Sequence, residues 1–223
     1  MATKSKLDFT KAPALPLTPV SYSRSYQDQL NNLLRLYFNQ IDNQSASLLA
    51  TAGGRYLSFP HIAAQDNDNQ YATGTNVATK VLWTSTDSNV GFTLNADSTA
   101  QTDLPGVYKI DYSLQFANTD SQIHDVFVWL HVDGADVAGS TSKFSVPSKH
   151  GSVSGYLVAY SSITFEVPAG EKIALYWATN QAATAGGATG VYMAADPAQT
   201  TPFTMPSTPS AIGSIVFVSA LTA

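Results

Sequence analysis

VYKIDYSLQFA, residues 107–117, alternates between apolar and polar side chains. Every second position from Tyr108 to Phe116 is apolar, whereas Lys109 and Asp111 are among the polar residues between them. Period two is typical of a β-strand that has one face buried and the other in water. We therefore expect a strand here, with its apolar face turned towards a core.

The chain on either side of this strand shows the same short segments separated by turn signals. Asp133-Gly134 follows an expected strand at 125–133 and is typical of a tight hairpin. Further strands are expected at 91–94, 136–137, 155–167, 172–179, 190–195 and 213–221. About eight to ten strands with no helical pattern between them predict an all-β fold, an antiparallel jelly-roll sandwich.

Two of the expected strands, 125–133 and 213–221, are apolar on both faces. A single sandwich leaves one face of each sheet in water, so such strands favour a subunit interface. The side chains that we expect at this interface are Phe127, Trp129, Ile215 and Phe217.

Large aromatic residues are frequent in the β region, and two interpretations of them stay open. They fill the core and a subunit seam, or they line a sugar-binding surface, because aromatic rings dominate both settings. The residues concerned are Trp83, Phe127, Trp129, Tyr156, Tyr160, Tyr176 and Trp177.

The N-terminal part of the chain follows different patterns. In PALPLTPV, residues 13–20, proline occurs at every third position, which favours an extended arm over 1–22; a disordered terminus is the alternative. Apolar residues then follow helical spacing, and they predict an amphipathic helix within 23–54 that is capped by Ser25 with Asp28 and ended by Gly53-Gly54. The remainder, 55–223, is the expected jelly-roll domain. Whether the helix forms a short trimeric coiled coil or packs on another surface stays open.

Composition excludes several classes of function. The 223 residues include no cysteine, so disulfides, thiolate metal sites and a cysteine nucleophile are excluded. A formal charge of -5 gives no electrostatic reason to bind nucleic acid, and no apolar run is long enough for membrane insertion or a signal peptide. Charged residues make up only 12% of the chain, against about a quarter in ordinary soluble domains, which suggests that much of the surface faces partners.

Candidate catalytic and metal-ligating residues are few. The histidines His61, His124, His131 and His150 lie on different segments, and His124 and His131 are expected on opposite faces of one strand. Asp133 and Asp136 are the best candidates for a cation pair, and Glu166 and Glu171 for a pair of catalytic carboxylates, but hairpin and strand-end chemistry explains both pairs. We therefore expect no catalytic residue, no cofactor and no metal, and hence no enzyme.

Residues 104–180 resemble the C1q/TNF-like jelly roll in the version found in bacteriophage virion proteins. The likeness is carried by GVYKIDYSLQF from Gly106, HDVFVWLHVDGADV from His124 and PAGEKIALYW from Pro168, and the N-terminal arm and helix also look like those of such proteins. The resemblance implies a homotrimer that decorates a capsid as a cement protein, with the major capsid protein as its partner. It also implies a location on the virion after synthesis in the host cytoplasm.

In this interpretation, the arm and the helix bind the capsid through their apolar side chains. The residues expected to do so are Leu7, Phe9, Leu15, Leu17, Val20, Tyr26, Leu30, Leu33 and Tyr37. The alternative is a phage tail-fibre or receptor-binding head that recognises host surface glycans through exposed aromatic residues and loops such as 182–190.

Overall fold

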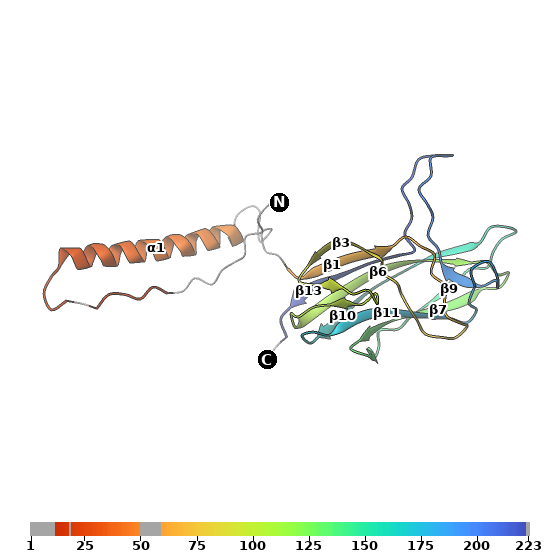
Figure 1. Ribbon diagram of the computed structural model, residues 1–223, viewed down its shortest axis with the longest axis horizontal. Coiled ribbons are helices and arrows are strands. Elements are labelled where there is room, and N and C mark those ends of the chain that lie inside the picture. The colour runs from red at the N-terminus through yellow and green to blue at the C-terminus, as the bar shows by residue number, and fades with distance from the viewer. Residues whose placement is uncertain (1–11, 18, 50–58, 222–223) are drawn as a thin grey trace. The chain divides into compact units, whose positions relative to one another are not determined.

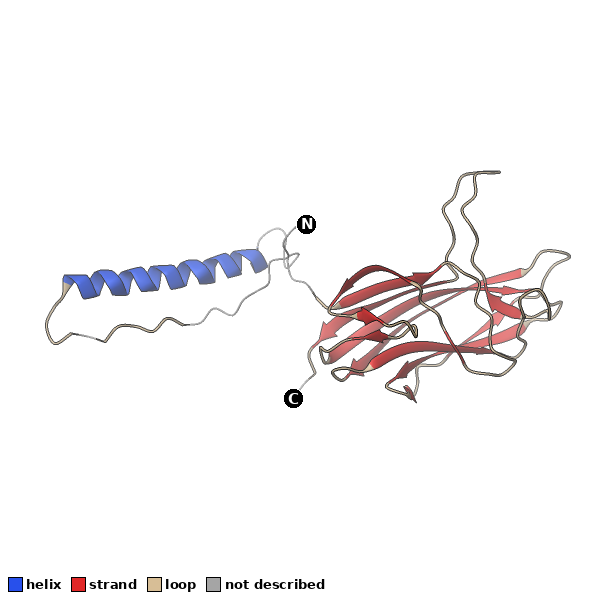
Figure 2. Cartoon of the chain, viewed as in Figure 1, coloured by secondary structure: helices blue, strands red, loops and turns tan. Residues whose placement is uncertain are grey.

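The computed structural model describes residues 12–17, 19–49 and 59–221 of the chain. The chain divides into two compact units, Met1–Ser58 and Phe59–Ala223, which we call the N-terminal unit and the head. The helix belongs to the first unit and the strands to the second (Figure 2). No helix among the described residues is long and apolar enough to cross a membrane.

The helix of the N-terminal unit, α1 (Arg24–Leu49), confirms the helical spacing of the sequence. Its stripe includes Leu30, Leu33 and Tyr37, which are half-buried, whereas Leu36 and Phe38 are more than half exposed. The amphipathic pattern therefore leaves large apolar side chains in solvent on a second side of the helix.

The start of α1 differs from the expected cap. The backbone N–H of Tyr26 donates to Oγ of Ser23 at 3.4 Å, so the capping residue is Ser23 rather than Ser25. A serine hydroxyl in this position satisfies one of the free N–H groups of the first turn. The expected stop at Gly53-Gly54 lies outside the described residues.

The arm segment 12–17 runs back alongside α1 (Figure 1). The hydroxyl of Tyr26 donates to the carbonyl of Pro16 at 3.3 Å, and Ala14 and Pro16 line a shallow hollow together with Leu33 of the helix. Contact with α1 therefore accounts for the half-buried state of Pro16, whereas Leu17 remains almost fully exposed.

The head consists of two antiparallel sheets. The first sheet has the order β10-β6-β13-β1-β3, with β12 beside β6, and the second has the order β4-β5-β11-β7-β8, with β2 beside β11 and β9 beside β7. The first contains β1 (His61–Asp66), β3 (Ser85–Val90), β6 (Gly106–Asn118), β10 (Gly155–Val167), β12 (Val191–Met193) and β13 (Ala211–Ser219). The second contains β2 (Thr79–Lys80), β4 (Thr93–Leu94), β5 (Ala100–Gln101), β7 (His124–Val132), β8 (Ala135–Asp136), β9 (Ser142–Val146) and β11 (Lys172–Thr179).

The pairing of the strands is nested, as in a jelly roll. The first strand pairs with the last, β1 with β13, and the next pairs inward are β5 with β11, β6 with β10 and β7 with β9. Pairing of β6 with β13 and of β7 with β11 joins these strand pairs into the two sheets. The expected antiparallel jelly-roll sandwich is thus confirmed by the strand order itself.

The core lies between the two sheets. Along β6, Tyr108, Leu114 and Phe116 are fully buried, as the alternation in the sequence predicts. Trp177 of β11 faces them from the second sheet, with its ring centroid 5.4 Å from that of Phe116. Burial of large side chains from both sheets supplies the main free energy that holds the sandwich together.

The hairpin between β7 and β8 confirms the expected Asp133-Gly134 turn. Both residues have positive φ angles, 48° and 80°, which a two-residue turn of this kind requires and which asparagine, aspartate and glycine tolerate best. Strand β8 begins at Ala135, one residue before the expected position.

Five strands, β1, β2, β3, β5 and β9, have no counterpart among the expected ranges. The sequence of β3 is STDSNV, and the strand is exposed along most of its length at the edge of the first sheet. Polar edge strands lack the apolar alternation by which buried strands are recognised, while their polarity protects the edge from pairing with other chains.

Residues 196–208 form a ribbon that projects from the head (Figure 1). Backbone groups of Asp196 and Thr208, and of Gln199 and Met205, hydrogen-bond across it. Near its tip Phe203 is 60% exposed, so this ribbon adds little to the core.

Candidate functional site

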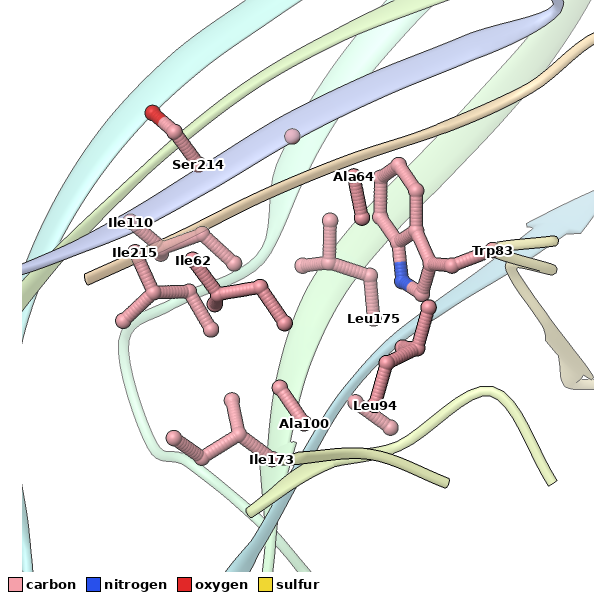
Figure 3. Close-up of a pocket in the computed structure, with 12 residues that line it drawn as sticks. Ile62, Ala64, Trp83, Leu94, Ala100, Ile110, Ile173, Leu175, Ser214 and Ile215 are labelled. Atoms are coloured by element: carbon pink, nitrogen blue, oxygen red, sulfur yellow. The ribbon is translucent and has the colours of Figure 1, made fainter. Parts of the chain in front are cut away.

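A cavity between the two sheets is the first place to look for a ligand (Figure 3). It holds about 30 Å³, and its lining is almost entirely apolar, with Ile62, Trp83, Leu175 and Ile215 among the side chains. Gly213 also borders it, and a Cβ atom there would lie only 2.7 Å from the Trp83 ring. This volume suits no more than one water molecule, so the cavity is a packing feature of the core.

The four expected subunit contacts divide between the inside and the outside of the head. Phe127 and Trp129 lie half-buried on the outer face of β7. Ile215, however, is only 6% exposed in the core, and the ring of Phe217 packs edge-on against Tyr108 at 5.6 Å. Alternation along β13 turns these two side chains inward, so the expectation that they form a subunit contact is corrected.

The outward positions of β13 contribute to a set of exposed apolar side chains on the first sheet, which we call the tyrosine face. The polar outward side of β6 runs between its members, and the hydroxyl of Tyr160 donates to Asp111 there at 3.2 Å. On β10, Tyr156, Val158 and Tyr160 are 59%, 54% and 60% exposed. Tyr160 and Ile212 both pair with Ser113 of β6, from opposite sides, so they lie in one row across the sheet. The tyrosine face consists of Tyr156, Val158, Tyr160, Ile212 and Val216.

A second pair of tyrosines borders the tyrosine face. The rings of Tyr71 and Tyr192 stack with centroids 5.2 Å apart. Burial, together with the neighbouring Tyr156, Tyr71 and Asp196, raises the pKa of Tyr192 above its ordinary value. The phenol of Tyr192 therefore stays neutral at physiological pH and presents a ring and a hydroxyl group rather than charge.

The outer face of the second sheet carries a different cluster, which we call the aromatic platform: Trp129, His131, Asp136 and Tyr176. Trp129 of β7 lies directly opposite Tyr176 of β11, and their rings stack with centroids 6.1 Å apart and planes 24° from parallel. The His131 ring lies 4.8 Å from that of Tyr176. Two antiparallel strands thus place three rings side by side on one surface.

Asp136 fixes two of these rings. Its Oδ1 accepts a hydrogen bond from Nε1 of Trp129 at 2.7 Å and lies 2.8 Å from Nδ1 of His131. The His131 contact first, and the Trp129 bond second, lower the pKa of Asp136 below its ordinary value. The tight hairpin is the cause of this arrangement, since it pairs Asp136 with His131 in the β7–β8 ladder.

Charged groups continue along the same face beyond the platform. Nζ of Lys143 lies 5.7 Å from the centroid of the Phe127 ring and 2.7 Å from Oδ2 of Asp125. Ser145 also donates to Asp125, at 2.6 Å. The surface around Trp129 therefore combines aromatic rings with polar groups of both charges.

In neither candidate pair, Asp133 with Asp136 or Glu166 with Glu171, do the two carboxylates act together, because their members have other partners or lie elsewhere. Asp136 is engaged by His131 and Trp129, whereas Asp133 hydrogen-bonds Glu171 and raises its pKa. Glu171 thus meets Asp133 at a turn, while Glu166 is exposed on β10. Among the described residues, no three or more histidines and carboxylates gather where they could hold a metal ion.

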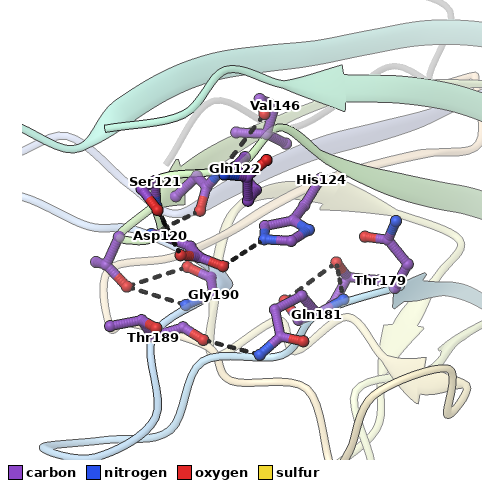
Figure 4. A network of polar contacts seen from close by, with 12 residues as sticks. Asp120, Ser121, Gln122, His124, Val146, Thr179, Gln181, Thr189 and Gly190 are labelled. Atoms are coloured by element: carbon purple, nitrogen blue, oxygen red, sulfur yellow. Dashed lines mark hydrogen bonds and ion pairs between the residues drawn. The ribbon is translucent and has the colours of Figure 1, made fainter. Parts of the chain in front are cut away.

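The expected glycan-binding loop, 182–190, is fastened to the head by a polar network (Figure 4). Gln181 donates to the carbonyl of Thr189 at 3.2 Å, and the hydroxyl of Thr119 accepts from the N–H of Gly190 at 3.1 Å. Nearby, His124 lies 2.8 Å from Asp120 and lowers the pKa of that carboxyl. These hydrogen bonds hold the base of the loop, so its polar residues are accounted for by the structure without a ligand.

Of the seven aromatic residues singled out in the sequence, two lie in the core and five on the two outer faces. Trp83 and Trp177 are buried; Phe127, Trp129 and Tyr176 lie on the second sheet, and Tyr156 and Tyr160 on the first. The contribution of His131 and Asp136 was not expected. The Asp-Gly turn after 125–133 was the available signal, because a hairpin brings the residues on its two sides together.

The head is an antiparallel jelly-roll sandwich, and it is similar to solved globular domains of the C1q and TNF type. One is the globular domain of zebrafish complement 1qA protein, with 11% identity, a TM-score of 0.43 and coverage of 74% of this chain and 100% of that one. Another is the Eiger TNF from S. frugiperda, with 16% identity, a TM-score of 0.40 and coverage of 74% and 96%. No family model matches the chain, and no curated protein matches it. The strand order alone therefore establishes the fold.

Proposed function

We propose that this protein is a structural component of a bacteriophage virion, a capsid decoration protein whose N-terminal unit binds the major capsid protein. The observation that carries the proposal is the exposure of large apolar side chains along that unit. Leu15, Leu17, Val20 and Tyr22 of the arm are 54%, 95%, 109% and 83% exposed. The resemblance of the arm, helix and head sequences to phage virion proteins supports the same assignment.

The arm is suited to binding because its apolar groups have little contact with its own helix. Only Pro13 and Pro16 are half-buried among the described arm residues, while Leu17 and Val20 lie in solvent. A partner surface that covers them gains about 25 cal/mol for each Å² of apolar area, less the entropy of ordering the chain. Of the expected capsid contacts, Leu7 and Phe9 lie outside the described residues, and Tyr26, Leu30, Leu33 and Tyr37 are half-buried on α1.

Deletion of residues 1–22 is expected to abolish capsid binding and leave a folded head, because the exposed apolar arm is lost while the jelly roll is untouched. Co-sedimentation with capsids that lack the protein measures this. The double change Leu17→Asp and Val20→Asp tests the same contact with the chain length kept, and Ser21→Asp is the matched control. Capsid binding that survives the deletion would contradict the role of the arm.

We further propose that the head is a homotrimer and that the tyrosine face contributes to its subunit contact. Three of its members are more than half exposed, and interface cores are enriched in tyrosine. The resemblance to C1q/TNF-like heads implies the same number of subunits. The low fraction of charged residues, 12%, is in keeping with a surface that is covered in the assembly.

Tyr160→Asp and Val158→Asp are each expected to convert the trimer into single chains, because either change places a carboxylate in an apolar contact that excludes water. Light scattering after gel filtration measures the result, from three times 23.7 kDa to 23.7 kDa. Thr93→Asp, an exposed position on β4 of the other sheet, is the control and leaves the mass unchanged. A wild-type particle of 23.7 kDa would overturn the trimer.

A further inference from the structure

The aromatic platform has the chemical character of a ligand surface rather than of a packing surface. Trp129 and Tyr176 present two stacked, nearly parallel rings on the outside of the second sheet. The side chain of Asp136 is 67% exposed beside them, and that of His131 is 23% exposed. Flat rings bordered by a few hydrogen-bonding groups are typical of sites that bind small amphipathic molecules.

The hydrogen-bonding capacity of the platform is only partly used within the protein. Both contacts of Asp136 use Oδ1, so Oδ2 can accept from a ligand hydroxyl. His131 contacts Asp136 through Nδ1, so its Nε2 is the ring nitrogen that can face a ligand. Because Trp129 and His131 are both held by Asp136, the platform is set before a ligand arrives, which lowers the entropy lost on binding.

The charges on this face distinguish between possible occupants. A second copy of the chain would bury Asp136, Asp125 and Lys143, whereas subunit interface cores are depleted in charged residues. Nucleic acid bases also stack on aromatic rings, but the carboxylate of Asp136 and a net charge of -5 repel phosphates. A neutral molecule with one apolar face and several hydroxyl groups meets neither obstacle.

We propose that the aromatic platform binds a neutral saccharide, a hexose or N-acetylhexosamine unit of an oligosaccharide. The apolar C–H face of the sugar ring packs against the Trp129–Tyr176 pair, and sugar hydroxyls donate to Oδ2 of Asp136 and contact Nε2 of His131. Binding at this face is independent of capsid attachment through the N-terminal unit, so the two proposals can fail separately.

A glycan array probed with the full-length protein tests the proposal, using neutral hexose and N-acetylhexosamine oligosaccharides alongside sialylated and phosphorylated ones. The strongest neutral saccharide is then titrated by calorimetry. We expect Trp129→Ala and Tyr176→Ala each to weaken its binding by about tenfold or more, because stacking area is lost. Asp136→Asn weakens it less, and Phe203→Ala, an exposed aromatic residue of the 196–208 ribbon, leaves it unchanged.

A measurement on the unaltered protein removes any dependence on how the variants fold. The chain has three tryptophans, and the other two, Trp83 and Trp177, lie in the core. Addition of the saccharide is expected to shift the indole N–H resonance of Trp129 in NMR spectra and to leave the other two in place. A blank array, binding confined to anionic glycans, or an unshifted Trp129 resonance with a bound saccharide each overturns the proposal.

Discussion

Trp177→Ala is expected to lower the free energy of unfolding by about 3–5 kcal/mol, the usual cost of deleting a large aromatic side chain from a core. Trp177 is fully buried, and its ring lies 5.4 Å from that of Phe116 across the sandwich. The change removes contacts between the two sheets and leaves a cavity that the rigid strands fill poorly. Urea unfolding followed by circular dichroism, at one fixed protein concentration, measures the loss.

Two further variants sharpen this prediction. Within the described part of the chain, Nε1 of Trp177 has no hydrogen-bond partner, so Trp177→Phe keeps much of the packing and removes a buried unpaired donor. It therefore costs less than the alanine change. Trp129→Ala makes the same substitution on the outer face and is expected to affect stability far less. Similar losses for Trp177→Ala and Trp129→Ala would contradict the placement of the two rings.

Gln70→Ala is expected to cost about 2–4 kcal/mol, because it leaves several buried polar groups without partners. Nε2 of Gln70 donates to Oδ2 of Asp66 at 2.8 Å and to the carbonyl of Leu82 at 3.1 Å, and its Oε1 accepts from the N–H of Leu82 at 2.8 Å. Asp66 is 1% exposed. Without Gln70, the carboxylate of Asp66 keeps the hydrogen bond that the Thr84 hydroxyl donates to it at 2.6 Å, but it loses the bond from Gln70.

The matched control for Gln70 is the nearby Gln65. Its side chain bonds Asp87 at 3.1 Å on the exposed side of β1, so Gln65→Ala is expected to change stability by no more than about 0.5 kcal/mol. Thermal unfolding of both variants measures the difference. Equal losses of stability for Gln70→Ala and Gln65→Ala would contradict a stabilising role for the buried hydrogen bonds of Gln70.

The sequence was sufficient for the strands that carry strong alternation and for the turn chemistry. The expected strand at 107–117 is found as β6, and the Asp133-Gly134 hairpin has the required backbone angles. It was insufficient for β1 and β3, because a short strand of mixed polarity and a polar edge strand gain their stability from neighbours distant in the chain.

The candidate surfaces were predictable only in part. Phe127 and Trp129 were expected at a subunit contact, and they do lie on the outer face of β7, because Val126, Val128 and Leu130 between and beside them face the core. The same argument failed for Ile215 and Phe217, because a strand that is apolar on both faces carries no mark of which face meets the core. That choice was made by pairing with β6, where Ile215 lies opposite the buried Ile110.

By itself, the sequence determined the fold class, the helix and the absence of cysteine chemistry, since these depend on periodicity and composition within short windows. Only the tertiary structure decided which residues share a surface. Trp129 and Tyr176 are 47 positions apart, and the β7–β11 register brings them face to face. Register is a property of long-range pairing, so an aromatic platform on one sheet and a tyrosine face on the other could be recognised only once the sandwich was formed.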